Sequence, residues 1–112
     1  MPYTINGESR QFAEPQHRDG TTFVPLAGIV ESLRGVVHWD ATSRVANIEI
    51  HGKNASVQSG EANVDRIGHQ VTMSRPAFLE NGQMWVPLDF FEKVLGFQVS
   101  ASGGNITIRA EQ

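Results

Sequence analysis

Apolar residues recur twice along the chain at the spacing of one helical face. Both runs begin directly after a Val-Pro dipeptide, where proline suits the end of a strand and the first turn of a helix because it has no N–H and a fixed φ. The first run comprises Leu26, Ile29, Val30 and Leu33, and the second comprises Leu88, Phe91 and Leu95, with Phe90 and Val94 alongside. The pattern predicts two short helices, with Gly96 as a left-handed C-terminal cap and Gly35 in a similar role one residue later in its own repeat.

Elsewhere apolar and polar residues alternate, which is the period of a half-buried strand. The dipeptide Asn6-Gly7 favours a two-residue hairpin turn because both positions tolerate positive φ. Asp19-Gly20 and Asn81-Gly82 each predict a tight turn before a strand that ends at proline. We expect strands beside these turns and a closing hairpin after each helix. The expected strands are residues 3–5, 9–12, 21–24 and 83–86 before the helices, and 37–39, 48–50, 97–101 and 106–108 after them.

The two halves of the chain match in one register. The matched positions, 62 residues apart, are Gly20 and Gly82, Val24 and Val86, Pro25 and Pro87, Leu26 and Leu88, Leu33 and Leu95, and Val37 and Val99. Residues 47–50 and 105–108 match at an offset of 58. Chance does not easily keep one register over so many apolar and backbone-special positions, so the sequence predicts a tandem duplication.

We therefore predict an α+β fold of two tandem repeats, each with antiparallel strands and hairpins and one short α-helix packed on the sheet. The first repeat is expected to span residues 1–51 and the second residues 61–112. Residues 52–60 are small and polar, and we interpret them as a linker or an edge strand. The chain has only 112 residues, too few for two independent domains of ordinary size, so we expect one compact domain overall.

Charge and composition narrow the classes of partner. The 9 basic and 12 acidic residues give a formal net charge of −3 without a run of Lys or Arg, so we expect no nucleic-acid partner. The chain has no cysteine, which excludes disulfides, thiolate catalysis and Cys-based zinc sites. No segment is long and apolar enough for membrane insertion. Because residues 1–4 lack the start of a signal peptide, we expect an extracellular or cell-surface location if a leader has been removed, and a cytoplasmic one otherwise.

In its order of motifs the chain resembles the stalk domain named after the N-terminal domain of bacterial copper amine oxidase. The residues that carry the resemblance are Phe23-Val-Pro-Leu26, Leu33, Val37-His-Trp-Asp40 and Ile48-Glu-Ile50, then Trp85-Val-Pro-Leu88, Leu95-Gly96, Val99 and Ile106-Thr-Ile108. The chain departs from the usual pattern in three places. Ala27 and Asp89 replace an Arg, Arg34 replaces a Gly, and Ala101-Ser102 replaces Trp-Asp.

The resemblance implies a non-catalytic module of bacterial cell-surface or secreted proteins. It also implies no copper site, because copper and the quinone cofactor belong to a separate catalytic domain of the oxidase. Among the four histidines only His38 and His51 merit consideration as a metal-binding pair, and their spacing matches no compact ligand motif. No Gly-x-Ser-x-Gly elbow is present, and Asp89 and Glu92 fit a solvated helix flank better than a catalytic pair. We expect no enzymatic activity, no cofactor, and no catalytic or metal-binding residues.

Aromatic residues provide the remaining candidates for a site. Phe23 and Trp85 are 62 residues apart, which predicts that both fill equivalent core positions. Trp39, on a hairpin, and Phe90, off the main helical stripe, are expected to be exposed and form the candidate partner-binding surface.

The leading functional hypothesis is a non-catalytic binding or assembly module that contacts a protein partner or a cell-wall polymer. It would act by adding a strand at a sheet edge or through a sheet face, and homo-oligomers could form through the same edges. One alternative is a cleft between the repeats that binds a small ligand or performs weak hydrolysis. Another is an intracellular stress or regulatory protein that uses the same fold.

Overall fold

The computed structural model describes residues 3–66, 68–102 and 104–110. In the first half they form β1 (Tyr3–Ile5), β2 (Glu8–Arg10), β3 (Gln16–Arg18), β4 (Thr21–Pro25), helix α1 (Leu26–Ser32), β5 (Val36–Asp40) and β6 (Val45–Ile50). In the second half they form β7 (Lys53–Gln58), β8 (Asn63–Arg66), β9 (His69–Thr72), β10 (Phe78–Glu80), β11 (Gln83–Pro87), a π-helical turn η1 (Phe90–Val94), β12 (Gln98–Ser102) and β13 (Asn105–Arg109). This mostly antiparallel β structure with little helix agrees with the predicted α+β class. No helix among these residues is long and apolar enough to cross a bilayer.

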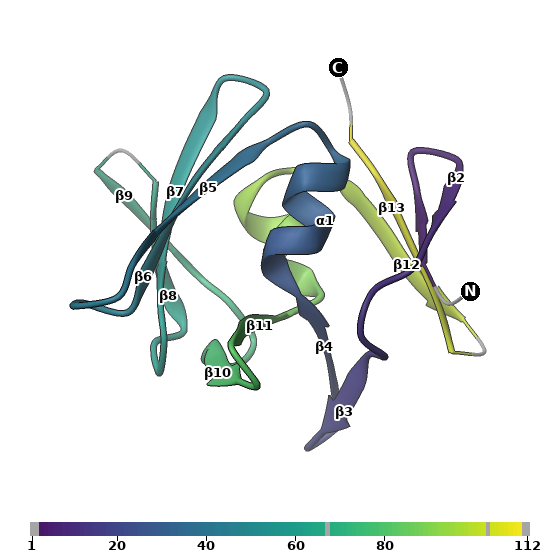
Figure 1. The fold of residues 1–112 in the computed structure, drawn as a ribbon, viewed down its shortest axis with the longest axis horizontal. Coiled ribbons are helices and arrows are strands. Elements are labelled where there is room, and N and C mark those ends of the chain that lie inside the picture. Colours follow the sequence, from purple (N-terminus) through teal and green to yellow (C-terminus); the bar gives the residue numbers. More distant parts are fainter. Residues whose placement is uncertain (1–2, 67, 103, 111–112) are drawn as a thin grey trace.

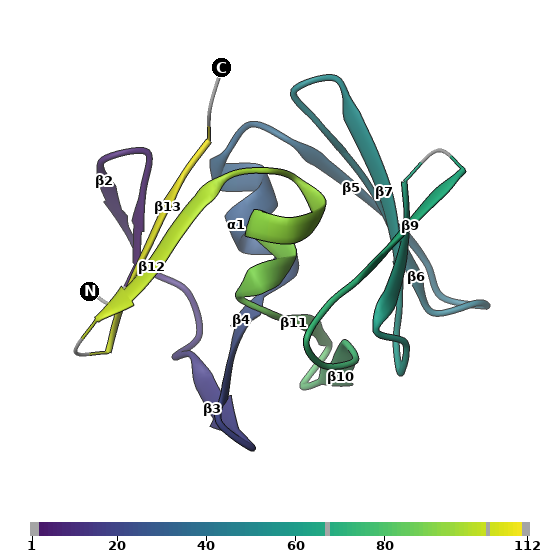
Figure 2. The same cartoon turned by 180° about the vertical axis from the view of Figure 1, so that it is seen from behind.

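The strands form three sheets around the two helical segments. The five-stranded sheet, in the order β5-β6-β7-β8-β9, and the terminal sheet, in the order β12-β13-β1-β2, stand on opposite sides in Figure 1. The central sheet, in the order β10-β11-β4-β3, lies between and below them. Helix α1 faces the viewer in Figure 1 and η1 faces the viewer in Figure 2, so the two segments fill the space between the side sheets from opposite directions.

Each side sheet contains strands from both halves of the chain. In the terminal sheet β1 pairs in parallel with β13, with Tyr3 opposite Ile106 and Ile5 opposite Ile108. The turn after β1 adds two hydrogen bonds, because the Asn6 N–H donates to the Ile108 carbonyl and the Asn6 Oδ1 accepts from the Ala110 N–H. The beginning and the end of the described chain are thus joined through backbone pairing.

The predicted turns are confirmed. Both residues of Asn6-Gly7, Asp19-Gly20 and Asn81-Gly82 have positive φ, and each pair connects two adjacent antiparallel strands. A fourth turn of this kind, His51-Gly52, joins β6 to β7.

Residues 52–60 differ from the expectation of a linker or an edge strand. Residues 53–58 form β7, which pairs with β6 along its whole length and with β8 on the other side. Ala55 and Val57 point into the core and are almost completely buried. The His51-Gly52 turn explains the difference, because a two-residue hairpin turn returns the chain beside the strand that it has just left.

The first predicted helix is confirmed as α1, but the second is not an α-helix. η1 is a single wide turn, closed by a hydrogen bond of 3.1 Å from the Gly96 N–H to the Glu92 carbonyl and one of 2.9 Å from the Phe97 N–H to the Phe91 carbonyl. Its consecutive residues Phe90 and Phe91 are both fully buried, because this side of the turn packs into the space between the side sheets, whereas Glu92 and Lys93 are exposed. The apolar spacing of a single α-helical face, on which the prediction was based, therefore does not describe η1.

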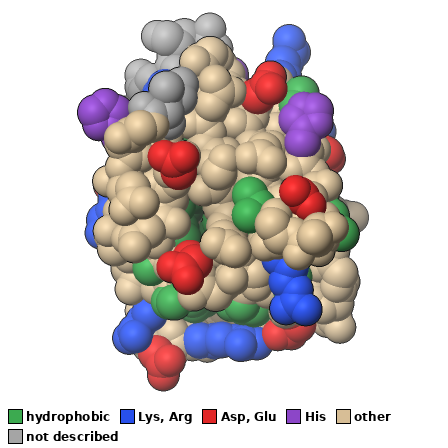
Figure 3. Space-filling view, turned by 90° about the vertical axis from the view of Figure 1, so that its left-hand side faces the viewer, with side chains coloured by type: hydrophobic (Ala, Val, Ile, Leu, Met, Phe, Trp, Pro, Cys, Tyr) green, Lys and Arg blue, Asp and Glu red, His purple; other side chains and the backbone are tan. Residues whose placement is uncertain are grey.

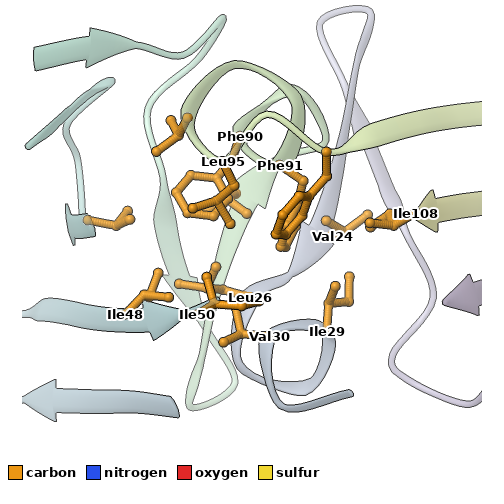
Figure 4. Close-up of a cluster of buried hydrophobic side chains, with 14 of the residues drawn as sticks. Val24, Leu26, Ile29, Val30, Ile48, Ile50, Phe90, Phe91, Leu95 and Ile108 are labelled. Carbon is orange, nitrogen blue, oxygen red and sulfur yellow. The ribbon is translucent and has the colours of Figure 1, made fainter. Parts of the chain in front are cut away.

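One cluster of buried apolar side chains contains residues of both halves. Figure 4 shows Phe90 and Leu95 of the second half packed close to Leu26 and Ile50 of the first. Phe23 and Trp85 are buried as predicted, each with 4% of its surface exposed. Both contact the ring of Phe78, at centroid distances of 5.0 Å and 6.3 Å.

The C-terminus of α1 corrects a detail of the predicted caps. The left-handed residue is Arg34, with φ of 69°, and not Gly35. The Arg34 N–H donates to the Glu31 carbonyl and the Gly35 N–H to the Val30 carbonyl, which is the hydrogen-bond pattern of a Schellman motif. Gly35 is needed for a different reason, since a Cβ there would lie 2.7 Å from Val30 Cγ1. Gly96 does have the left-handed conformation predicted for it, with φ of 75°.

Replacing Arg34 with glycine is expected to stabilise the protein. The side chain is exposed and the left-handed conformation costs a non-glycine residue about 1 kcal/mol, so Arg34→Gly should raise the free energy of unfolding by roughly that amount. Denaturant unfolding measures the change. Gly35→Ala is the control, and it should lower stability by about 1–3 kcal/mol because its methyl group has no room. A loss of stability in Arg34→Gly would contradict the assignment.

Tyr3 is the largest polar side chain in the core. It is fully buried, its ring packs edge-on against Phe12, and its hydroxyl donates to the Ala13 carbonyl over 2.7 Å. Burial raises the pKa of Tyr3 far above its ordinary value, and the charge of Glu14 raises it further. The folded chain therefore keeps this phenol neutral at a pH at which the unfolded chain ionises it.

Tyr3→Phe is expected to lower the free energy of unfolding by about 1 kcal/mol at neutral pH, because the Ala13 carbonyl loses its donor. Above a pH of about 10 the unfolded wild-type chain ionises Tyr3 and the folded chain does not, so the wild type loses stability that the variant keeps. The stability difference should therefore shrink as the pH rises. Unfolding measured from neutral to alkaline pH tests this, and a difference that is constant with pH would contradict it.

Candidate functional site

The described part of the chain exposes three large apolar side chains, namely Val36, Trp39 and Leu79. Two of them, Trp39 and Leu79, line the same groove, which has a volume of about 420 Å³. We call it the Trp39 groove. Its apolar lining consists of Leu26, Ala27, Val37, Trp39, Ala46, Leu79 and Met84, and the Asn81-Gly82 turn completes one end.

One wall of the groove is formed by the five-stranded sheet. Side chains alternate between the two faces of β5, and those on the inner face line the groove. Val37 and Trp39 point to the inner face, where they lie opposite Ile48 and Ala46 of β6. Ala46 is too small to cover an indole ring, and 47% of the surface of Trp39 remains exposed. The pairing of a large residue with a small one thus leaves a hollow beside the ring.

The opposite wall is the hairpin of β10 and β11. Leu79 and Met84 lie opposite each other across the Asn81-Gly82 turn, so both side chains project on the same side of the hairpin. Sequence reasoning did not select either residue. The signal was present, since two apolar residues at equal distances from a two-residue turn must share a face.

The charged residue in this wall is held by neighbouring side chains. Arg18 donates to Glu80 Oε1 over 2.5 Å, and Gln16 Nε2 lies 3.4 Å from Glu80 Oε2. The guanidinium of Arg18 also lies over the ring of Phe78 at 4.4 Å from its centroid. An exposed ion pair of this kind contributes little to stability, but its contacts hold Glu80 beside the groove and not in its apolar centre.

A second, smaller groove has a volume of about 240 Å³. Leu88, Asp89 and Val99 line it, 62 positions after Leu26, Ala27 and Val37 of the Trp39 groove. The rest of its described lining is mostly polar and consists of Thr21, Thr22, Ser74 and Glu92. Asp89 Oδ2 accepts from the Ser74 N–H and lies 3.4 Å from Lys93 Nζ. The position 62 residues after Trp39 is Ala101, so this groove has no indole at the equivalent place.

Of the two residues predicted to form an exposed surface, the structure exposes only Trp39. Phe90 is fully buried, packed against Phe91 at a centroid distance of 5.0 Å. The prediction that Phe90 is exposed is therefore wrong, because Phe90 lies on the side of η1 that packs into the core. In this conformation Phe90 cannot contact a partner.

The structure does not bring the considered chemical groups into one site. His38 is exposed on the outer face of β5, whereas His51 Nε2 donates to the Leu33 carbonyl over 3.0 Å at the end of α1. No three His, Asp or Glu side chains of the described residues gather as a metal site. Glu80 lies at the Trp39 groove, whereas Asp89 and Glu92 line the second groove.

Comparison with known proteins agrees with the resemblance drawn from the motifs. The whole chain is 25% identical, over 113 aligned positions, to a Brevibacillus choshinensis protein named protease inhibitor, and it spans 35% of that protein's length. Residues 4–110 match the family described as the copper amine oxidase N-terminal domain. Because the match covers nearly the whole fold, from β1 to the residue after β13, the chain belongs to the copper amine oxidase N-terminal domain family.

Proposed function

We propose that the protein is a non-catalytic module that binds a partner protein through the Trp39 groove. The observation that carries this proposal is the contrast between the two grooves. Both are built from corresponding positions of the two halves, yet one is apolar with a half-exposed indole and the other is mostly polar. We assign the function to the groove in which two large apolar side chains, Trp39 and Leu79, are left exposed.

The contrast is informative if the two halves are tandem repeats, which is part of the proposal. Support for repeats comes from the central sheet, where Val24 lies directly opposite Val86 and the strands run antiparallel. Arg18 of β3 and Glu80 of β10 are also 62 positions apart, and they form an ion pair between the two edge strands of the same sheet. The second groove then serves as an internal comparison. Its polar lining supports the interpretation that a repeat does not need an apolar groove at this place, so we attribute the exposure of Trp39 and Leu79 to function.

A protein partner fits the Trp39 groove better than a small polar ligand. Small-molecule sites place several convergent polar groups around a ligand, whereas the charged group of this wall, Glu80, is held by Arg18 and Gln16. A half-exposed tryptophan beside leucine and methionine is typical of the anchor residues of protein interfaces. The name of the Brevibacillus relative is consistent with this class, because a protease inhibitor acts by binding another protein.

The proposal can be tested by selecting binders from a display library of random peptides on the immobilised protein. Selected peptides should lose affinity at least about tenfold on Trp39→Ala, because a central aromatic anchor is removed. Val36→Ala is the matched control, since Val36 is equally exposed but lies on the opposite face of β5. It should change affinity by less than about twofold. Failure to select any peptide, or binding that is insensitive to Trp39→Ala, would contradict the proposal.

Inhibition of a protease is the specific form of binding that the name of the relative favours. The protein should then slow the cleavage of a chromogenic peptide by at least one member of a panel of serine, cysteine, aspartic and metalloproteases. Trp39→Ala should weaken this inhibition, and Val36→Ala should leave it unchanged. If no protease of the panel is inhibited by the wild type, this form of the proposal fails and the binding proposal is unaffected.

A further inference from the structure

Strand β5 is an open edge beside the Trp39 groove. It stands at the end of the five-stranded sheet, and among the described strands it pairs with β6 alone. Other sheets also end in open strands, but β5 carries the half-exposed Trp39 of the groove. An edge strand offers free N–H and C=O groups to another extended chain. At β5 those groups lie next to the apolar lining of the Trp39 groove.

The outer face of the five-stranded sheet has a distinct charge. Its described ionised side chains are all acidic, and they are Asp40, Glu49 and Asp65. Figure 3, which views the molecule from this side, shows carboxylates set apart from one another with some apolar atoms between them, and Lys and Arg mainly toward the margins.

The cations of the same strands are directed away from this face. Lys53 Nζ donates to the Leu95 carbonyl and Arg66 Nη1 to the Val94 carbonyl, so both side chains point toward the end of η1 in the interior. Arg44 lies in the turn between β5 and β6. The outer face beside β5 therefore attracts positive charge, and the inner face, at the Trp39 groove, attracts apolar groups.

We propose that β5 accepts an extended segment of the partner protein as an added strand of the five-stranded sheet. This inference rests on the proposed function and specifies the chemistry of the partner. Side chains alternate between the two faces of a strand, so the segment carries apolar residues at every second position, which enter the groove beside Trp39. The residues between them are basic, and they face Asp40 and Glu49 on the outer side.

A second copy of this chain fits the same edge less well. If β5 of one molecule paired antiparallel with β5 of another, centred on His38, each Asp40 would lie opposite Val36 of the other copy. The two acidic outer faces would then become neighbours in one continuous sheet, and like charges at such distances repel. Charge complementarity thus favours a basic segment of a different protein.

The test uses three synthetic peptides with the wild-type chain. One alternates Val and Lys, one has the same composition with all Val before all Lys, and one alternates Val and Glu. Binding is followed by amide chemical shifts and by hydrogen exchange of residues 36–40. We expect the alternating Val/Lys peptide to bind at least about tenfold more tightly than either other peptide, and to slow amide exchange in β5. The double variant Asp40→Asn and Glu49→Gln should weaken its binding about threefold or more at low salt.

The outcomes separate this inference from the proposed function. If library-selected peptides bind in a manner sensitive to Trp39→Ala but leave exchange in β5 unchanged, groove binding stands and strand addition is overturned. Equal affinity for the Val/Lys and Val/Glu peptides would overturn the basic chemistry of the segment. Concentration-dependent dimers that protect β5 without any peptide would show that a second copy is the occupant. If no peptide of any kind binds, both proposals fail.

Discussion

The antiparallel pairing of β4 with β11 is the constraint on which the rest of the molecule depends. Each strand ends at a proline that leads into a helical segment, α1 in one half and η1 in the other. Because the two strands run in opposite directions, the chain leaves the central sheet on opposite sides. The helical segments therefore fill the core from two directions, and each side sheet is completed by strands of the other half.

This arrangement makes the two halves mutually dependent. The buried cluster contains residues of both, β1 finds its parallel partner in β13, and β7 carries the sheet of β5 and β6 on to β8. Neither half retains its neighbours without the other. A 112-residue chain buries enough apolar surface for one such core but not for two. The two halves therefore share it.

A shared scaffold also leaves room for difference between the halves. Residues 62 positions apart line an apolar groove around Trp39 and a second groove with more polar side chains around Asp89. In the first, a small Ala46 opposite Trp39 leaves the indole half exposed; in the second, Asp89 holds the Ser74 N–H and contacts Lys93. Side chains that the fold does not need for stability are free to serve binding, and at the Trp39 groove they stand next to an open strand edge.

The local elements could be read from the sequence because they depend on neighbouring residues. The Asn-Gly and Asp-Gly turns, α1 after Pro25, and the burial of Phe23 and Trp85 all follow from backbone preference and from the spacing of apolar residues. The family was also readable, from motifs that recur in order along the chain. The exposure of Trp39 was predicted from its place on a hairpin.

Long-range packing decided the features that the sequence did not predict. These features depend on contacts between residues that are far apart in the chain. Phe90 is buried since η1 lies between two sheets, and β7 lies inside a sheet since the His51-Gly52 turn folds it back on β6. Leu79 and Met84 belong to the groove only because the β10–β11 hairpin is placed opposite β5. The sequence by itself thus determined the Asn-Gly and Asp-Gly turns and most of the strands, whose physical causes are local, and it also indicated the family. Only the tertiary structure decided which apolar side chains were left facing water, because burial depends on what packs against each face.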